Sequence, residues 1–229
     1  MQGILLVDKP AGWTSFDVVN YVRRIVASVE GKKPKNCKVG HSGTLDPFAT
    51  GLLILLVGKE YTRRASEFSK LDKTYEMTMR LGQTSTTGDP EGEITEVSEH
   101  VPPKEEIEQA LEQFRGPIQQ IPPAFSAIKI NGVRAYKLAR DGKEVIIEAR
   151  PVTINRLELL EYNYPEVKLV ADVTSGTYIR TLVEDLGKVL QTGAYTTVLR
   201  RISVGIELVS EAVTTNGLDA EVLEETLKQ

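Results

Sequence analysis

The chain has 229 residues, 41% of them hydrophobic and 26% charged, a balance that indicates a globular protein with one large domain or two small ones. Its one cysteine, Cys37, excludes an internal disulfide and a cysteine-based metal site, and two histidines are too few for a histidine-rich metal centre. The first residues do not have the pattern of a signal peptide and no apolar run reaches the ~20 residues of a membrane span, so we expect a cytoplasmic protein without membrane attachment.

The net charge of −4 is unevenly distributed along the chain. Residues 81–112 contain nine acidic residues and one basic residue, and residues 207–229 contain six acidic residues and one basic residue. Residues 1–80 contain 13 basic and 8 acidic residues, and residues 113–206 contain 13 and 9. Attraction to phosphate depends on the local patch rather than on the total charge, so this segregation favours a basic, RNA-facing surface over a chance fluctuation.

Strands dominate the predicted elements, and helices interrupt them. In the first half of the chain we expect a strand over 4–8, a helix that follows a capping box at 14–17, and strands over 52–59, 74–81 and 93–97. A helix that follows Pro102 and Pro103 and a helix over 133–141 come next. The last part is expected to contain strands over 152–162 and 167–174, a helix over 178–190, a strand over 198–208, and one acidic helix in the remainder. The fold class is α+β, with a large mixed, mostly antiparallel β-sheet flanked by helices and loops.

The stretch over 40–53, GHSGTLDPFATGLL, contains the strongest single signal of the chain. The carboxylate of Asp46 precedes a proline, which restrains its backbone, and Gly43 and Gly51 allow sharp turns or close approach to a ligand. This pattern indicates a carboxylate aimed at a substrate. An ordinary Asp-Pro turn between two elements explains the same residues equally well.

Several familiar chemistries lack their motifs. Gly58-Lys59 is followed by Glu60, so it is not a phosphate-binding loop, and neither a dinucleotide fingerprint nor a His-Glu-x-x-His zinc motif occurs. A glycosidase-like pairing of Asp46 with Asp89 is weakly supported, because the sequence does not fix their separation. We therefore expect neither a cofactor nor a metal.

Five separated groups of residues occur in a distinctive order and together cover nearly the whole chain. They are 6–15; 38–53; 73–76 with 80–82 and 87–92; 121–129 with 136 and 139–142; and 175–182 with 185–187. In this order they resemble the TruB family of tRNA pseudouridine synthases. The resemblance implies the pseudouridine synthase catalytic fold and an isomerase that converts uridine 55 in the T arm of tRNA.

The resemblance implies three catalytic residues. Asp46 matches the essential aspartate, Arg180 the arginine that pairs with it, and Tyr75 the tyrosine that stacks on the target base and is implicated in removing the proton from its carbon-5. A carboxylate is ionised at neutral pH, and a guanidinium fork suits its orientation. Without the resemblance, a structural tyrosine and a surface ion pair would be the better interpretations of Tyr75 and Arg180.

Substrate binding is implied for a second set of residues. His41 matches the histidine that fills the space left by the flipped base, Asp89 lies near the base, and Tyr178 shapes the pocket. Lys129, Arg140 and the lysines within 32–38 are candidates for phosphate contacts, which add affinity without reading sequence. Structural support of the site is implied for Lys9, Pro10, Gly43, Thr44 and Leu45. Turn or surface roles are the alternatives for each of these residues taken alone.

The domain organisation departs from that of many bacterial relatives. We expect a catalytic domain over 1–208 and an acidic C-terminal tail over 209–229, without the small RNA-binding domain of the PUA type. The expected partner is tRNA, bound by a monomer with no obligatory protein partner. Two alternatives stay open at this point: an RNA-binding or tRNA-folding protein with a vestigial site, and a pseudouridine synthase that acts on another RNA.

Overall fold

A computed structural model describes residues 1–130, 132–142 and 145–228. The chain divides into two compact units, one formed by Met1–Glu76 together with the segment that begins at Leu199, the other by Met77–Val198. Strands β4 (Lys73–Leu81) and β12 (Ala194–Val204) contribute residues to both units. Among the described residues, no helix has the length and apolar composition required to cross a membrane.

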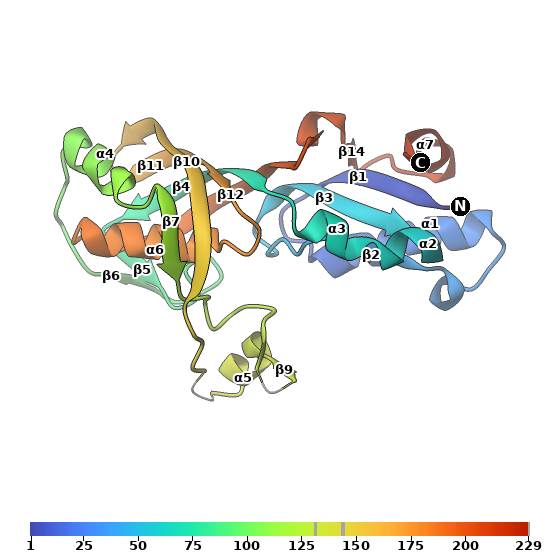
Figure 1. Ribbon diagram of the computed structural model, residues 1–229, viewed down its shortest axis with the longest axis horizontal. Helices are drawn as coiled ribbons and strands as arrows, with labels where there is room; N and C mark the ends of the chain where they lie inside the picture. The colour runs from blue at the N-terminus through green and yellow to red at the C-terminus, as the bar shows by residue number, and fades with distance from the viewer. Residues whose placement is uncertain (131, 143–144, 229) are drawn as a thin grey trace. The chain divides into compact units, whose positions relative to one another are not determined.

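The first unit is built on strands in the order β14-β1-β3-β12, with β2 paired to β3 and β13 to β12 (Figure 1). Strands β1 and β3 are antiparallel, with Leu6 opposite Ile54, whereas β1 pairs with β14 and β3 with β12 in parallel. Its elements are β1 (Gly3–Lys9), α1 (Ser15–Val29), η1 (Pro34–Asn36), β2 (Val39–His41), β3 (Thr50–Val57), α2 (Lys59–Arg63), α3 (Ala65–Ser69), β13 (Glu207–Leu208), η2 (Val209–Glu211), β14 (Val213–Thr214) and α7 (Ala220–Thr226).

Both faces of β1 and β3 are covered, which explains why their sequences are continuously apolar rather than alternating. On one face, Leu5, Val7 and Leu53 pack in a core that also contains buried side chains of α1 and α7. On the other face, Leu6 and Ile54 pack with further buried residues of this unit, among them Tyr61 and Val204. The Asp46 loop leaves and re-enters this doubly covered sheet, because it connects β2 to β3.

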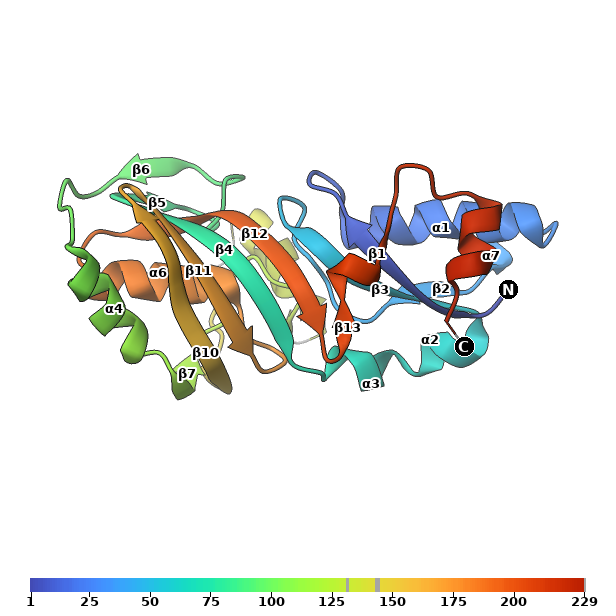
Figure 2. The same cartoon turned by 90° about the horizontal axis from the view of Figure 1, so that it is seen from above.

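The second unit has the strand order β12-β4-β11-β10-β7 (Figure 2). The long hairpin of β10 and β11 is antiparallel, as is the pairing of β10 with β7, and α4 contacts both β10 and α6. Helix α6 turns a strongly apolar face inward, burying Ile179, Leu182, Val183 and Leu186. Its elements are β5 (Gln83–Ser85), β6 (Ile94–Glu96), α4 (Lys104–Glu112), β7 (Gly116–Gln120), β8 (Lys129–Ile130), β9 (Val133–Arg134), α5 (Ala135–Arg140), β10 (Arg150–Asn163), β11 (Glu166–Val173) and α6 (Ile179–Val189).

The mostly antiparallel sheet with flanking helices confirms the predicted fold class, whereas several elements differ from the prediction. The strand expected over 52–59 ends at Val57, and the strand expected from 198 already begins at Ala194. The helix expected over 133–141 begins at Ala135, because β8 and β9 form a short hairpin first. The strand expected over 198–208 breaks at Gly205, whose φ of +58° turns the chain so that β13 pairs back on β12. The C-terminal segment forms η2 and β14 before α7, whose Leu223 is fully buried.

Candidate functional site

Asp46 lies in the loop that joins β2 to β3, at the start of a tight turn. The Ala49 amide donates to the Asp46 carbonyl at 3.1 Å, which closes the turn around Pro47. The Gly12 amide donates to the Pro47 carbonyl at 2.8 Å, so the loop after β1 holds the turn from outside. The Asp46 side chain is half-buried. A carboxylate on a restrained turn has few orientations to lose when a substrate binds.

Lys9 also holds this turn, through a hydrogen bond to the Pro47 carbonyl. Its side chain is completely buried, and its ammonium donates to the carbonyls of Pro10 at 2.9 Å, Trp13 at 2.6 Å and Pro47 at 3.2 Å. A buried ammonium requires such acceptors, because an unsatisfied charge in the interior is costly. The contacts join both sides of the loop that follows β1 to the turn that contains Asp46. The role of Lys9 and Pro10 in supporting a catalytic site stays a prediction.

Two further buried side chains hold this loop, and the sequence did not single them out. The Ser15 hydroxyl donates to the Leu45 carbonyl at 3.1 Å and accepts from the Leu45 amide at 2.8 Å. The Arg201 guanidinium donates from Nε to the Leu52 carbonyl at 2.7 Å and from Nη2 to the Gly43 carbonyl at 3.2 Å. Ser15 lies in a recognised motif and Arg201 in the Arg200-Arg201 pair, but neither pattern reveals these partners.

The remaining predicted residues of the first unit occupy different environments. His41 is half-buried at the end of β2, in register with Leu55 of β3. Thr44 is exposed, whereas Leu45 is buried. Tyr75 points to the buried face of β4, where it is 8% exposed and alternates with half-buried residues.

Lys73 is a second buried lysine of the first unit, on the same face of β4 as Tyr75. Burial, followed by the nearby positive charge of Arg201, lowers the pKa of Lys73 to about 8. The ammonium donates to the Ser69 carbonyl at 2.8 Å and to the Leu71 carbonyl. No role was predicted for this lysine, although it is the first residue of one of the motif segments.

In the second unit, Arg180 lies in the first turn of α6 and is 4% exposed. Its Nη1 donates to the Thr87 carbonyl at 2.7 Å and its Nη2 to the Phe125 carbonyl at 2.8 Å. Nη1 also lies 3.3 Å from a carboxylate oxygen of Asp89, with both side chains buried. The arginine therefore joins the start of α6 to the turn after β5 and to the segment before β8.

Asp89 is buried in that turn and accepts hydrogen bonds from its own neighbours. Its Oδ1 accepts from the Thr87 hydroxyl at 2.6 Å and from the Glu91 amide at 3.0 Å, while Oδ2 faces Arg180. The turn-stabilising role that we set beside substrate binding is thus present in the structure. The contact with a substrate stays a prediction.

Gln120 fixes the residue at which α6 begins. Its side-chain amide donates to the Tyr178 carbonyl at 3.0 Å and its side-chain carbonyl accepts from the Tyr178 amide at 2.7 Å. Gln120 is 2% exposed at the end of β7, so the start of α6 is tied to the edge of the sheet. Tyr178 itself is half-buried. The position of Arg180 follows from this attachment because it lies two residues further along the chain.

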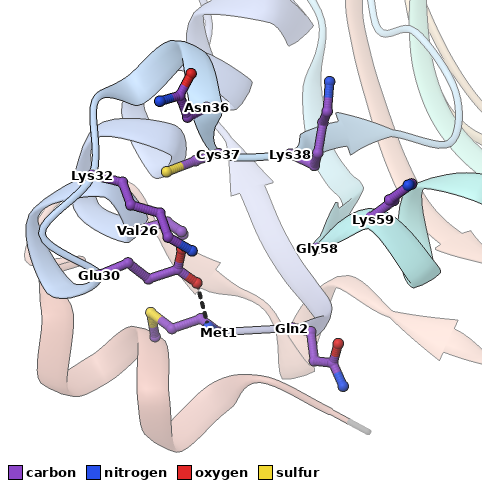
Figure 3. Close-up of a pocket in the computed structure, with 10 residues that line it drawn as sticks. All are labelled: Met1, Gln2, Val26, Glu30, Lys32, Asn36, Cys37, Lys38, Gly58 and Lys59. Atoms are coloured by element: carbon purple, nitrogen blue, oxygen red, sulfur yellow. Dashed lines mark hydrogen bonds and ion pairs between the residues drawn. The ribbon is translucent and has the colours of Figure 1, made fainter.

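The predicted phosphate contacts lie on exposed segments. Lys129 is exposed in β8, and Arg140 is exposed at the end of α5, where its guanidinium lies 5.7 Å from the centre of the Tyr136 ring. In the first unit, Lys38 and Lys59 project beside a hollow of about 520 Å³, which Lys32 also lines (Figure 3). Glu30 in this hollow accepts from Lys32 at 2.8 Å and from the α-amino group of Met1 at 2.5 Å.

The structure groups the predicted site residues within each unit. Lys9 and the Asp46 loop are joined by hydrogen bonds in the first unit, and Arg180 and Asp89 by an ion pair in the second. The expected ion pair of Asp46 with Arg180 would link residues of different units, and it stays a prediction. Among the described residues, no group of three or more His, Cys, Asp or Glu side chains could hold a metal.

Solved structures with a similar fold include two assemblies that contain Cbf5. A Cbf5-Nop10-Gar1 complex contains a chain that matches 94% of this one with a TM-score of 0.70 and 27% identity. An archaeal box H/ACA Nop10-Cbf5 complex matches 99% with a TM-score of 0.68 and 24% identity, which supports the fold alone. The present chain spans 53% and 59% of those chains. These likenesses agree with the predicted catalytic fold.

Two family models together match residues 31–229, and curated relatives cover most of the chain. The model of the TruB family pseudouridylate synthase N-terminal domain matches residues 31–179, and that of the tRNA pseudouridylate synthase B C-terminal domain matches residues 180–229. The tRNA pseudouridine synthase B of Phocaeicola vulgatus is 43% identical over 99% of this chain and 97% of its own length. That of Bacteroides fragilis is 48% identical over 88% of this chain and 86% of its own. The chain therefore belongs to the TruB family of pseudouridylate synthases.

Proposed function

We propose that this protein isomerises uridine 55 in the T arm of tRNA to pseudouridine. The observation that carries the proposal is the similarity to relatives named tRNA pseudouridine synthase B, which extends over nearly the full length of both chains. The motif segments that contain Asp46, Tyr75 and Arg180 are intact within that length. A protein that had kept RNA binding and lost its chemistry would be expected to have lost at least one of the three.

The reaction exchanges one bond to the ribose for another. The bond from ribose carbon-1′ to uracil N1 breaks, the base turns, and carbon-1′ bonds to carbon-5 of the same base. Carbon-5 gives up its hydrogen as a proton and N1 gains a proton, so the product is an isomer and no electrons leave the substrate. The residues must therefore position the base, stabilise charge and move one proton.

Asp46 supplies the essential carboxylate in this proposal. Three roles are open to it: attack on the ribose, attack on the base, and abstraction of a proton from the sugar. All three require an ionised carboxylate in a fixed direction, and the hydrogen-bonded turn around Pro47 provides a restrained backbone for it. Pairing with the guanidinium of Arg180 would keep the carboxylate ionised where water is excluded.

The remaining roles concern the flipped base. A stacked uridine must leave its helix to react, at a cost of a few kcal/mol, and an aromatic ring that stacks on it offsets part of that cost. We assign this stacking, and the removal of the proton from carbon-5, to Tyr75. His41 would fill the vacated space, and Tyr178 would shape the pocket.

Basic segments in both units would hold the RNA backbone. The exposed lysines within 32–38, together with Lys129 and Arg140, present positive charge without burying it. Contacts of this kind add affinity that depends on salt and leave base recognition to the pocket. Recognition would then rest on the shape of the T arm together with one splayed-out loop base. We further propose that the protein acts as a cytoplasmic monomer with no obligatory protein partner.

The experiment that tests the proposal follows tritium at carbon-5 of uridine. Unmodified tRNA transcript labelled at that position is incubated with the wild-type chain, with Asp46→Asn, and with no protein. Tritium leaves carbon-5 only if the new bond forms there. We expect release by the wild type and a loss of more than about a thousandfold for Asp46→Asn, because a residue that takes part in bond making is rarely replaceable. A transcript with cytidine at position 55 is the substrate control.

Failure takes three distinguishable forms. Binding without release by the wild type would favour the RNA-binding alternative. Release from the position-55 control transcript would indicate another target uridine. Equal release by Asp46→Asn and the wild type would remove Asp46 from the chemistry.

A further inference from the structure

We propose that Ser15 and Arg201 are positioning residues that set the backbone of the Asp46 loop for catalysis. The inference rests on the proposed function, since positioning has meaning only if Asp46 acts on a substrate. Neither side chain is assigned to contact the RNA. Both act on main-chain atoms of residues close to Asp46, and both belong to the first unit, as does the loop itself.

Ser15 acts on the peptide groups of the residue directly before Asp46. One hydroxyl satisfies both the amide and the carbonyl of Leu45, and Ser15 is 3% exposed, so water cannot readily replace either bond. A residue held at both its amide and its carbonyl has little freedom in φ and ψ. The direction in which the chain enters Asp46 is therefore fixed from α1.

The hydroxyl is itself held on a rigid element. Ser15 is the first residue of α1, and Thr14 and Asp17 form the complete capping box around it: the Asp17 amide donates to the Thr14 hydroxyl at 3.1 Å, and the Thr14 amide to Asp17 Oδ2 at 2.9 Å. A cap of this type defines where a helix begins. The capping motif thus has a second consequence here, because it places the next hydroxyl against the loop.

Arg201 joins the two ends of the loop. Its planar guanidinium reaches Gly43, three residues before Asp46, and Leu52, six residues after it. Gly51 allows the main chain of Arg201 to lie against the same segment: a Cβ at Gly51 would lie 2.3 Å from the Arg201 carbonyl oxygen. One side chain therefore closes the ten-residue segment 43–52 at both ends.

The buried charge of Arg201 indicates that this residue serves to hydrogen bond the loop rather than only to fill space. Arg201 is 2% exposed, and its hydrogen-bond partners among the described residues are main-chain carbonyls rather than carboxylates. The positive charge of Arg201 also disfavours the charged form of the buried Lys73. An apolar side chain of similar volume would avoid the cost of a buried charge. Only a side chain with several N–H donors, such as a guanidinium, can hold the carbonyls of Gly43 and Leu52 at the same time.

The test compares Ser15→Ala and Ser15→Thr, with Ser203→Ala as a matched control. Ser203 is also a buried serine of the first unit, 8% exposed, and it takes no part in the described contacts of the loop. For each variant we would measure the single-turnover rate on tritiated tRNA, the Kd for tRNA, and the melting midpoint, with the rate taken well below that midpoint.

We expect Ser15→Ala to lower the single-turnover rate about ten- to a hundredfold, the effect of a small misplacement of a reacting group, while the Kd for tRNA changes less than about threefold. Ser15→Thr, which keeps a hydroxyl, should recover most of the rate. Ser203→Ala should retain the wild-type rate. Arg201→Lys, which keeps the charge and loses the fork, should resemble Ser15→Ala.

Hydrogen exchange provides a readout that does not depend on activity. Loss of the Ser15 hydroxyl should accelerate exchange at the amides of 43–49 and leave that of β1 and β3 unchanged. Faster exchange in Ser15→Ala, together with no turnover by the wild type, would mean that the proposed function is wrong although Ser15 and Arg201 do hold the loop. A wild-type rate for Ser15→Ala in an active protein would overturn the inference. Failure of Ser15→Ala and Arg201→Lys to fold would overturn it too, because the contacts would then be structural.

Discussion

The Asp46 loop and the surroundings of Arg180 hold their side chains by two different means. In the first unit, the buried cations Lys9 and Arg201 and the hydroxyl of Ser15 hydrogen bond to main-chain groups of the loop. In the second unit, the buried cation Arg180 is a predicted catalytic group; it also donates to the main-chain carbonyls of Thr87 and Phe125, and in addition the carboxylate of Asp89 faces it at 3.3 Å. The first arrangement uses main-chain partners for its buried cations, whereas the second adds a buried ion pair.

The difference indicates what each region can tolerate. Hydrogen bonds to main-chain groups depend on the position of the backbone, so the first arrangement should be sensitive to any group that displaces the backbone. A buried ion pair depends on the presence of both charges, so removing one charge should cost more than displacing its neighbours. Three substitutions test this difference between the two units.

The largest effect on stability is expected for Asp89→Asn. The substitution leaves the guanidinium of Arg180 buried without its carboxylate, which should cost about 3–5 kcal/mol of unfolding free energy. Asp172→Asn is the matched control, because Asp172 pairs with Arg156 in the same unit on half-exposed side chains, and such pairs are worth about 1 kcal/mol or less. Urea denaturation measures both. Equal losses would mean that the second unit does not depend on the buried charge pair.

A smaller loss is expected for Gly51→Ala, which tests how closely the main chain of Arg201 lies against the segment that follows Asp46. Its φ of +102° and the overlap of the new Cβ with the Arg201 carbonyl should together cost about 3 kcal/mol. Gly12→Ala is the control: its φ is +79°, and no atom lies within 4 Å of the added Cβ, so backbone strain of about 1–2 kcal/mol should remain. If thermal unfolding gave the same loss for both, the close approach of Arg201 to the loop would be wrong.

The smallest effect is expected for Glu184→Gln in α6, and it depends on pH. Burial raises the pKa of Glu184 above its ordinary value of 4.5, although the positive charges of Lys188 and Arg180 oppose the shift. A raised pKa in the folded state contributes stability that is complete below pH 4.5 and is lost as the pH rises through the folded value. Glutamine stays neutral, so the variant should gain Tm relative to the wild type from pH 4.5 upward. A gain that was larger at pH 4 than at pH 8 would reverse the assigned direction.

Local features of the fold were predictable from the residues alone. The capping box at Thr14 and Asp17 needs neighbours within one helical turn, and the structure has it. The strand at 198–208 was predicted as continuous because the apolar pattern extends across Gly205, and the pattern carries no information about the positive φ that turns the chain there. The hairpin of β8 and β9 was missed because each of its strands has only two residues.

The candidate site was predictable only in its chemistry. The motif segments contain Asp46, Tyr75 and Arg180, and the family comparison agrees with the isomerase activity that the resemblance implied. Gln120, Ser15 and Arg201 were missed, because each acts on backbone atoms 30 or more residues away along the chain. A main-chain amide or carbonyl has the same chemistry at every residue, so a sequence cannot indicate which one a side chain will reach.

The residues alone were enough to indicate the family, the segregation of charge and the apolar faces of the helices, and to predict Asp46 as the reactive carboxylate. These properties depend on the kinds of residue present and on their spacing over a few turns or strands. Packing of distant segments brings the carboxylate of Asp89 to the buried cation Arg180, and brings Ser15 and Arg201 to the loop that contains Asp46. Such partners are chosen when distant segments pack together, because a buried polar group must find its hydrogen bonds among whatever atoms the fold brings to it.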